Sequence, residues 1–175
     1  MADFLSLIQK NPLGRPLKIA ITGGVHSGKT TRASEWIDIF RSKGMVCIGC
    51  LERAVFDAEN KRIGYDFEDI HSGESRPFAR RVNALDGCWK YQFNDQIWSW
   101  YERGYKQFPS PDIVVFDELG RLEASGDGIM PFVETYIREN QAVSAYLFVC
   151  RGDVMDMLSE KLSGFDEIER ISKET

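Results

Sequence analysis

The sequence predicts an α/β fold, a mostly parallel sheet flanked by helices with one inserted antiparallel hairpin. Short apolar runs alternate along the chain with segments whose apolar residues recur at helical spacing, as in parallel strands joined by helices. A polar turn between two strand-like segments predicts the hairpin. The 175 residues suit one domain, so we expect a single domain over 1–175, with residues 1–16 as an N-terminal extension.

The first predicted elements are a strand, a helix and a second strand. An apolar run at residues 17–22 predicts a strand that ends at Gly23. A helix is expected from Lys29, and Gly44 is suited to end it because glycine readily adopts the left-handed conformation. Residues 45–51 predict a second buried strand. The helix carries an apolar face at i, i+3, i+4 and i+7 spacing, formed by Ala33, Trp36, Ile37 and Phe40.

The hairpin is predicted in the middle of the chain. Apolar residues at 54–56 and alternating apolar residues at 63–67 flank the polar turn at 57–60. Residues 71–87 contain two glycines, a proline and three arginines, and we expect a loop there. Alternating aromatic residues then predict a strand at 89–93.

The second half of the chain repeats the alternation of helix and strand. Asn94 is suited to cap a helix, residues 113–116 form the apolar run of a central parallel strand, and Pro131 is suited to open a helix. A strand, a helix and a strand are expected at residues 145–150, 154–162 and 168–171. The predicted apolar helix faces are Ile97, Trp100 and Tyr101; Phe132, Val133, Tyr136 and Ile137; and Val154, Met157, Leu158 and Leu162.

Composition and charge exclude several classes of protein. The chain is 43% hydrophobic and 28% charged, which excludes a disordered chain and a small disulfide scaffold. Its formal net charge of −5 argues against nucleic acid as a partner, so the aromatic residues of 89–101 are expected to pack rather than stack on bases. The apolar stretch near the start covers only residues 4–8, so we expect no secretory leader, no membrane span and a cytoplasmic location.

The four cysteines are expected to be buried thiols. Cys47 and Cys50 form a C-x-x-C pair, but a zinc site needs a second pair, and a redox motif lies at a strand-to-helix turn. Cys88 and Cys150 stand alone in the sequence. Free cysteine is among the most buried residue types, which favours a core role.

A glycine-rich motif between the first strand and helix predicts a phosphate-binding site. Residues 23–30 match G-x-x-x-x-G-K-[ST], the P-loop pattern, in which backbone N–H groups and a helix N-terminus surround phosphate oxygens. Lys29 is expected to reach the β- and γ-phosphates and Thr30 to bind Mg²⁺, whereas His26 is interpreted as a loop residue without chemistry. The candidate nucleotide-binding residues are Gly23, Gly24, Val25, His26, Ser27, Gly28, Lys29, Thr30 and Thr31.

Two carboxylates follow the central apolar strand. Asp117 comes directly after residues 113–116, where a Walker B aspartate holds Mg²⁺, often through a metal-bound water. Glu118 is the next residue, and a carboxylate there is suited to orient or deprotonate an attacking water. We therefore predict Thr30 and Asp117 as metal ligands and Glu118 as a catalytic residue, together with Lys29.

Three motifs in the same order resemble the THEP-type nucleoside-triphosphatases. The family shows I-T-G-x-x-x-x-G-K-T-T, here residues 21–31; [KR]-R-I-G-[FY], here 61–65; and D-E-[IL]-G-[KR]-[ML]-E, here 117–123. The resemblance covers about residues 18–150. It implies a P-loop NTPase fold with a RecA-like sheet extended by antiparallel strands. It also implies Mg²⁺-dependent hydrolysis of nucleoside triphosphates, ATP and GTP among them, to diphosphate and phosphate.

The sequence departs from the family pattern in three places. It has a longer N-terminal lead, it has Cys-Leu-Glu-Arg at residues 50–53 where the family tends to have F-Y-T-x-E, and its region after Cys150 is shorter. The last two departures concern base recognition and substrate positioning. Phosphate binding is unaffected.

Arginine side chains are the candidates for stabilising transition-state charge. Arg121 is the first choice because it lies closest in sequence to the carboxylate pair. A small-molecule kinase and a slowly hydrolysing nucleotide-dependent switch remain alternatives to a hydrolase, and the sequence leaves protein partners unknown. The arginines of 76–81 suggest a kinase lid but lack its usual spacing. The other candidate arginines are Arg53, Arg76, Arg80, Arg81 and Arg151.

Overall fold

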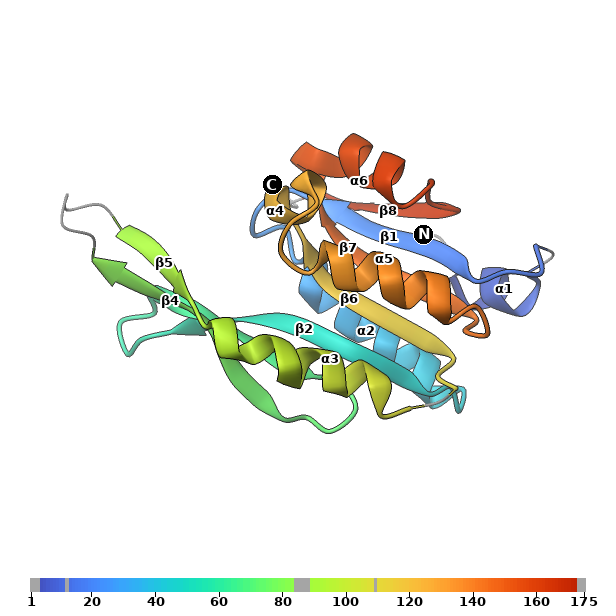
Figure 1. Ribbon diagram of the computed structural model, residues 1–175, viewed down its shortest axis with the longest axis horizontal. Helices are drawn as coiled ribbons and strands as arrows, with labels where there is room; N and C mark the ends of the chain where they lie inside the picture. The colour runs from blue at the N-terminus through green and yellow to red at the C-terminus, as the bar shows by residue number, and fades with distance from the viewer. Residues whose placement is uncertain (1–3, 12, 84–88, 109, 173–175) are drawn as a thin grey trace.

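A sheet of eight strands runs through the part of the chain that the structure describes (Figure 1). This computed structural model describes residues 4–11, 13–83, 89–108 and 110–172. The strand order is β5-β4-β3-β2-β6-β7-β1-β8. The strands are β1 (Leu17–Gly23), β2 (Cys47–Phe56), β3 (Arg62–Asp69), β4 (Ser75–Asn83), β5 (Trp89–Phe93), β6 (Ile113–Leu119), β7 (Ala145–Arg151) and β8 (Glu167–Ile171).

The parallel half of the sheet contains β2, β6, β7, β1 and β8. Its central strands are buried on both faces, and residues 113–116 are fully buried. Alternate side chains enter two separate core clusters, so that Ile19 and Ile21 pack on one face of the sheet and Ala20 packs on the other. This arrangement confirms the predicted α/β fold with a mostly parallel sheet.

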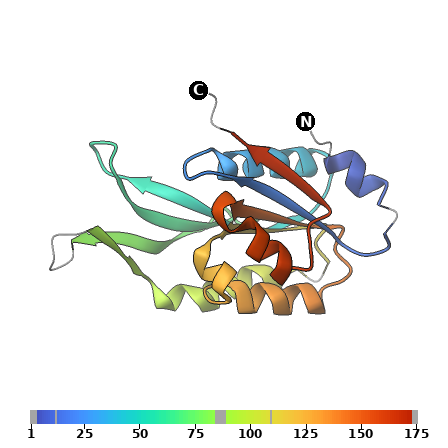
Figure 2. The same cartoon turned by 90° about the horizontal axis from the view of Figure 1, so that it is seen from above.

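Helices cover both faces of this parallel half (Figure 2). Helices α1 and α2 lie on one face, and α3 to α6 lie on the other. The predicted apolar face of α2 is buried throughout, and the Asn94 side chain accepts a hydrogen bond from the Gln96 N–H before α3. The helices are α1 (Phe4–Gln9), α2 (Lys29–Ser42), α3 (Trp98–Lys106), α4 (Arg121–Ser125), α5 (Met130–Glu139) and α6 (Met155–Lys161), with 3-10 turns at Asp95–Ile97 and Gly152–Val154.

The antiparallel part of the sheet is larger than the predicted hairpin. The first residues of β2 pair with β6, whereas residues 50–56 pair with β3, which pairs with β4, which pairs with β5. Strands β3, β4 and β5 with residues 51–56 form a wing that projects beyond the helices (Figure 1). The loop predicted at 71–87 is wrong for Ser75–Asn83, which is β4; residues 84–87 lie outside the described ones. Only Ala79 of β4 is buried, so no apolar alternation marks this strand in the sequence.

Three smaller differences have simple causes. The strands predicted at 45–51 and 54–56 are one continuous strand, β2. Three residues of the face predicted at 154–162 are buried, namely Val154, Leu158 and Leu162. Met157 is 51% exposed and Met155 is buried instead, because α6 begins only after a 3-10 turn. The sequence does not predict α1 or α4, since helices of six and five residues are too short to show a helical period.

The cysteine and membrane predictions can be compared with the described residues. Cys47, Cys50 and Cys150 are buried and free, as expected, and burial raises the pKa of the Cys47 thiol to about 12. Cys88 lies outside the described residues. None of the helices that the structure describes has the length and apolar character needed to cross a membrane.

Candidate active site

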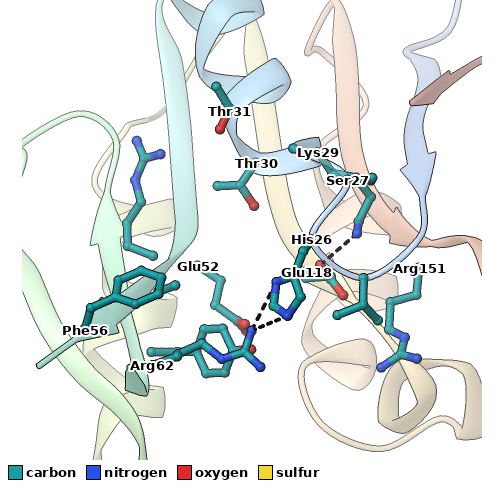
Figure 3. A pocket seen from close by; sticks show the side chains of 15 residues that line it. His26, Ser27, Lys29, Thr30, Thr31, Glu52, Phe56, Arg62, Glu118 and Arg151 are labelled. Carbon is teal, nitrogen blue, oxygen red and sulfur yellow. Dashed lines mark hydrogen bonds and ion pairs between the residues drawn. The ribbon is translucent and has the colours of Figure 1, made fainter. Parts of the chain in front are cut away.

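A cavity of about 470 Å³ opens where the parallel strands end and the wing begins (Figure 3). Residues 25–31 line one side, from the loop after β1 and the first turn of α2. Glu118 and Arg151 line it from the ends of β6 and β7. Ligands of open α/β sheets bind at this carboxyl edge of the strands. The wing contributes the remaining lining residues, which are Glu52, Arg53, Ala54, Phe56, Arg62 and Tyr65.

The loop after β1 has the backbone shape that its glycines allow. Gly28 caps the N-terminus of α2 with a φ of +89°, a conformation that other residues rarely adopt. A Cβ on Gly23 would lie 2.5 Å from both the Ser27 Oγ and the Ile171 carbonyl oxygen. The 14-residue helix α2 therefore begins directly at the cavity, where its N-terminal N–H groups favour an anion.

Lys29 and Glu118 meet at the cavity. The Lys29 Nζ donates a hydrogen bond of 2.9 Å to the Gly24 carbonyl and lies 3.4 Å from the Glu118 Oε2. The Lys29 side chain is only 4% exposed, whereas that of Glu118 is 27% exposed. The structure thus brings together two residues that lie 89 positions apart in the sequence, and the water-accessible one is the carboxylate.

Asp117 lies beneath the cavity and is fully buried. Its Oδ2 accepts a hydrogen bond of 3.1 Å from the Glu52 N–H, and its Oδ1 is buried without a hydrogen-bond partner among the described residues. Burial and the neighbouring Glu118 charge raise the pKa of Asp117 to about 7, although the Thr30 hydroxyl, the Glu52 N–H and Lys29 act in the opposite direction. Among the described residues no salt bridge neutralises this carboxylate, and the Lys29 charge offsets the rise in its pKa only in part.

The donor set around Asp117 fits Mg²⁺. An unpartnered carboxylate oxygen and the Thr30 hydroxyl are hard oxygen ligands of the kind that this ion prefers. The described residues contain no cluster of three or more His, Cys, Asp or Glu side chains that would hold a metal ion without other ligands. Mg²⁺ is typically held by one or two protein groups with substrate phosphates and water, which matches this sparse donor set.

The candidate arginines differ in where the structure places them. Arg121 is not among the lining residues, its side chain is 74% exposed, and its Nη2 pairs with Asp153 at 2.9 Å. Arg151 lines the cavity and pairs with the same carboxylate. The three arginines of β4, which suggested a lid, do not line it either. The role assigned to Arg121 stays a prediction, without support from its position.

Sequence reasoning missed the contribution of the wing. Glu52, Arg62 and Tyr65 were assigned no role, although two of them belong to the motif at residues 61–65. The Arg62 Nη1 lies 2.9 Å from the His26 Nε2, and its guanidinium carbon lies 5.2 Å from the centre of the Tyr65 ring. Figure 3 shows Arg62 directed toward His26. The specific motif signalled that these residues matter, but only tertiary structure shows where they act.

A family model described as "NTPase" matches residues 18–166 of the chain. The chain belongs to this NTPase family. The nucleoside-triphosphatase THEP1 of Pyrobaculum islandicum is 33% identical over 107 residues, which cover 61% of this chain and 60% of that protein. The THEP1 proteins of Methanosarcina acetivorans and Sulfolobus acidocaldarius are 25% and 28% identical and cover 75% and 76% of the chain, or 75% and 77% of their own lengths. The family resemblance and the enzyme class that it implied are thereby confirmed.

Two solved structures share the fold. A human cancer-related nucleoside triphosphatase superposes with a TM-score of 0.68 at 16% identity, covering 90% of each chain. THEP1 from Aquifex aeolicus superposes with a TM-score of 0.58 at 19% identity, covering 89% of this chain and 90% of that one. These likenesses confirm the predicted P-loop NTPase architecture.

Proposed function

We propose that the chain hydrolyses nucleoside 5'-triphosphates, ATP and GTP among them, to diphosphate and phosphate with Mg²⁺, and that Glu118 orients the attacking water. The observation that carries the proposal is the position of Glu118, 3.4 Å from the Lys29 Nζ. Lys29 belongs to the glycine-rich segment 23–30, which we call the phosphate loop. A water held by this carboxylate would lie beside a terminal phosphate that Lys29 contacts.

The loop and helix α2 supply the binding part of the reaction. Backbone N–H groups at the start of α2 and the Lys29 ammonium attract the β- and γ-phosphates. Thr30 and Asp117 would hold Mg²⁺. When bound, this ion would neutralise charge on the phosphate oxygens. Binding the triphosphate requires Lys29 to exchange its contact with the Gly24 carbonyl for phosphate oxygens.

The reaction itself transfers a phosphoryl group to water. The water oxygen forms a bond to the γ-phosphorus while the bond from that phosphorus to the β–γ bridging oxygen breaks, and the bridging oxygen keeps the electron pair. One proton of the water stays on the released phosphate, and the other passes to a phosphate oxygen or to solvent. Glu118 accepts a hydrogen bond from the water and aligns it. Its partial exposure gives water access to the carboxylate. The acidic chain is expected to act on free nucleotides in the cytoplasm and not on nucleic acid.

The test measures phosphate release from ATP, GTP, CTP and UTP without an acceptor, with Mg²⁺ or with excess EDTA. We expect release from several triphosphates with Mg²⁺ and none with EDTA. Glu118→Gln is expected to lower kcat by about a hundredfold or more while nucleotide affinity changes little, since general-base contributions have about this size. The matched control is Glu59→Gln, which removes an exposed carboxylate in the turn between β2 and β3 and should keep the wild-type rate.

Other outcomes identify other functions. Phosphate transfer only in the presence of an added acceptor would indicate a small-molecule kinase. Stoichiometric nucleotide binding without turnover would indicate a switch. Wild-type kcat in Glu118→Gln would remove Glu118 from the mechanism and leave hydrolysis itself intact.

A further inference from the structure

Arg62 differs from the other arginines of the wing and the cavity in its partners. Arg53 pairs with Glu68, Arg80 with Asp66, Arg76 with Glu74, and Arg151 with Asp153. The salt bridges between described residues include none of Arg62, whose charge nevertheless acts on Glu52 in the same cavity and opposes the rise in the pKa of that buried carboxyl. An arginine in a salt bridge must break that salt bridge before it can bind a phosphate. Of the cavity arginines named here, Arg62 is the one that can bind a phosphate without breaking a salt bridge.

The Arg62 guanidinium already lies against the phosphate loop. Its Nη1 is 2.9 Å from the His26 Nε2 and 3.2 Å from the Nδ1 of the same ring. Its Nε is buried and has no hydrogen-bond partner among the described residues. The side chain also packs over the Tyr65 ring. The Arg62 guanidinium is therefore held at the loop with an N–H group that has no acceptor. The glycine-rich pattern of the loop predicts that phosphate oxygens bind there and would accept hydrogen bonds from this guanidinium.

The side of the cavity on which Arg62 lies indicates which phosphate of a bound nucleotide it contacts. Strand β2 lies next to β6 in the sheet, and β3 follows β2, so the wing borders the end of β6 that carries Asp117 and Glu118. The hydrolytic carboxylate and the metal ligand mark the γ-phosphate end of a nucleotide in the loop. Arg62 enters the same cavity as Glu118 from the wing side. It therefore faces the terminal phosphate and not the base.

We propose that Arg62 is a second cationic side chain that contacts the γ-phosphate, opposite Lys29, and that it stabilises the charge that develops there during hydrolysis. This inference rests on the proposed function. Without a nucleotide the Arg62 guanidinium contacts the His26 ring, and when a triphosphate binds, the guanidinium exchanges this contact for one with the γ-phosphate. A nucleoside diphosphate has no group at that position and leaves the contact with His26 intact. The wing thus supplies the charge that distinguishes a triphosphate from a diphosphate.

The first test measures binding and does not depend on turnover. ATP and ADP affinities are compared in Glu118→Gln protein with and without Arg62→Ala, by titration calorimetry with Mg²⁺. We expect Arg62→Ala to weaken ATP by about tenfold or more and ADP by less than about twofold, since only ATP reaches the guanidinium. Equal weakening of both nucleotides, or none, would overturn the proposal. Arg76→Ala, which removes an arginine of the same wing that is paired with Glu74, should change neither affinity.

The second test measures kcat in the otherwise wild-type chain. Arg62→Ala is expected to lower kcat by about a hundredfold or more, in line with arginines at transferring phosphates, and Arg62→Lys to recover only part of it because lysine lacks the planar fork. Added guanidinium should partly restore Arg62→Ala and leave Glu118→Gln unchanged. A kcat within threefold of wild type, or a larger loss in Arg121→Ala, would overturn the assignment.

The two proposals fail in different ways. If wild-type protein releases no phosphate but ATP still binds more weakly to Arg62→Ala, the proposed hydrolysis fails and the phosphate contact stands. If wild-type protein is active and Arg62→Ala behaves like Arg76→Ala, only the role of Arg62 fails. Thermal unfolding of each variant separates loss of the guanidinium from loss of the fold, and Arg62→Lys keeps most of the packing if the alanine variant is unstable.

Discussion

The parallel half of the sheet and the wing are built on different physical principles. Strands β1, β6 and β7 are buried on both faces and carry almost only apolar side chains. In the wing, β4 buries a single residue, and Tyr91 and Phe93 of β5 are 36% and 47% exposed. Burial stabilises the first region throughout, whereas the wing is buried mainly at Phe67 of β3 and is otherwise held by backbone pairing and exposed ion pairs. The first region carries the glycine-rich loop at its strand ends, and the second places charged side chains at the same cavity.

The largest expected effect separates the two regions by stability. Phe116 of β6 is fully buried and stacks on Tyr105 with ring centres 5.1 Å apart. We expect Phe116→Ala to lower the free energy of unfolding by about 3–5 kcal/mol. Phe93→Ala removes the same side chain from the wing, where it is half exposed, and should cost less than about 1 kcal/mol. Urea unfolding measures both, and equal losses would show that the wing has a core of its own.

The next effect separates the regions by function. Lys29→Ala removes the buried ammonium of the phosphate loop and is expected to lower kcat/KM by about a hundredfold, or roughly 2.7 kcal/mol of transition-state stabilisation. Lys61→Ala removes an exposed lysine in the turn between β2 and β3 and should leave kcat/KM within about twofold of the wild-type value. Phosphate release at several ATP concentrations measures both constants. Unchanged kcat/KM in Lys29→Ala would remove the lysine from the phosphate site.

The smallest effect concerns an ion pair at the edge of the parallel half. Asp166 accepts two hydrogen bonds from Arg15, at 2.7 and 2.9 Å, and one from the Lys18 N–H at 2.8 Å. The hydrogen-bonded Arg15 guanidinium lowers the pKa of Asp166, although its partial burial acts in the opposite direction. Because the folded pKa lies below the ordinary aspartate value of about 3.9, the stabilisation is present above that pH and is lost as pH falls below it.

We therefore expect Asp166→Asn to lower the free energy of unfolding by about 1 kcal/mol at pH 7, a small figure because the Arg15 side chain is 49% exposed. The difference from wild type should shrink as the pH falls below the ordinary aspartate value of about 3.9, because the folded-state advantage is lost there. Denaturant unfolding at a series of pH values measures it, with Glu160→Gln on α6 as an exposed control. A difference that persists unchanged at low pH would show that the charge of Asp166 does not contribute.

The sequence predicted the parallel half well because burial leaves a periodic trace. Residues 113–116 and the face of α2 are apolar in the pattern that burial on a sheet or beside one requires. Strand β4 left no such trace, because a strand exposed on both sides selects no apolar period. Its sequence Ser-Arg-Pro-Phe-Ala-Arg-Arg-Val-Asn therefore resembled a loop.

The residues of the candidate site show the same contrast between those that the sequence indicates and those that only the structure places. The sequence indicates the glycine-rich loop and the pair Asp117–Glu118 as candidates because each lies within a short segment whose spacing is typical of its chemistry, and the structure brings them to one cavity. Glu52 and Arg62 were not, since they reach the cavity only through strand pairing between β2 and β3. Proximity in sequence also favoured Arg121, which the fold turns toward Asp153 and away from the cavity lining.

The sequence by itself determined the parallel core, the phosphate loop and the carboxylate pair, because each depends on neighbours a few positions away or on burial that repeats at a regular period. Tertiary structure alone decided the extent of the wing, the unpartnered oxygen of Asp117 and the contact between Arg62 and His26. Those features depend on residues that are distant in the chain and adjacent only across paired strands. The side chains at 54–67 indicate a hairpin, but backbone hydrogen bonds, which every residue except proline can form, set the remaining pairing of the wing and therefore which side chains reach the cavity.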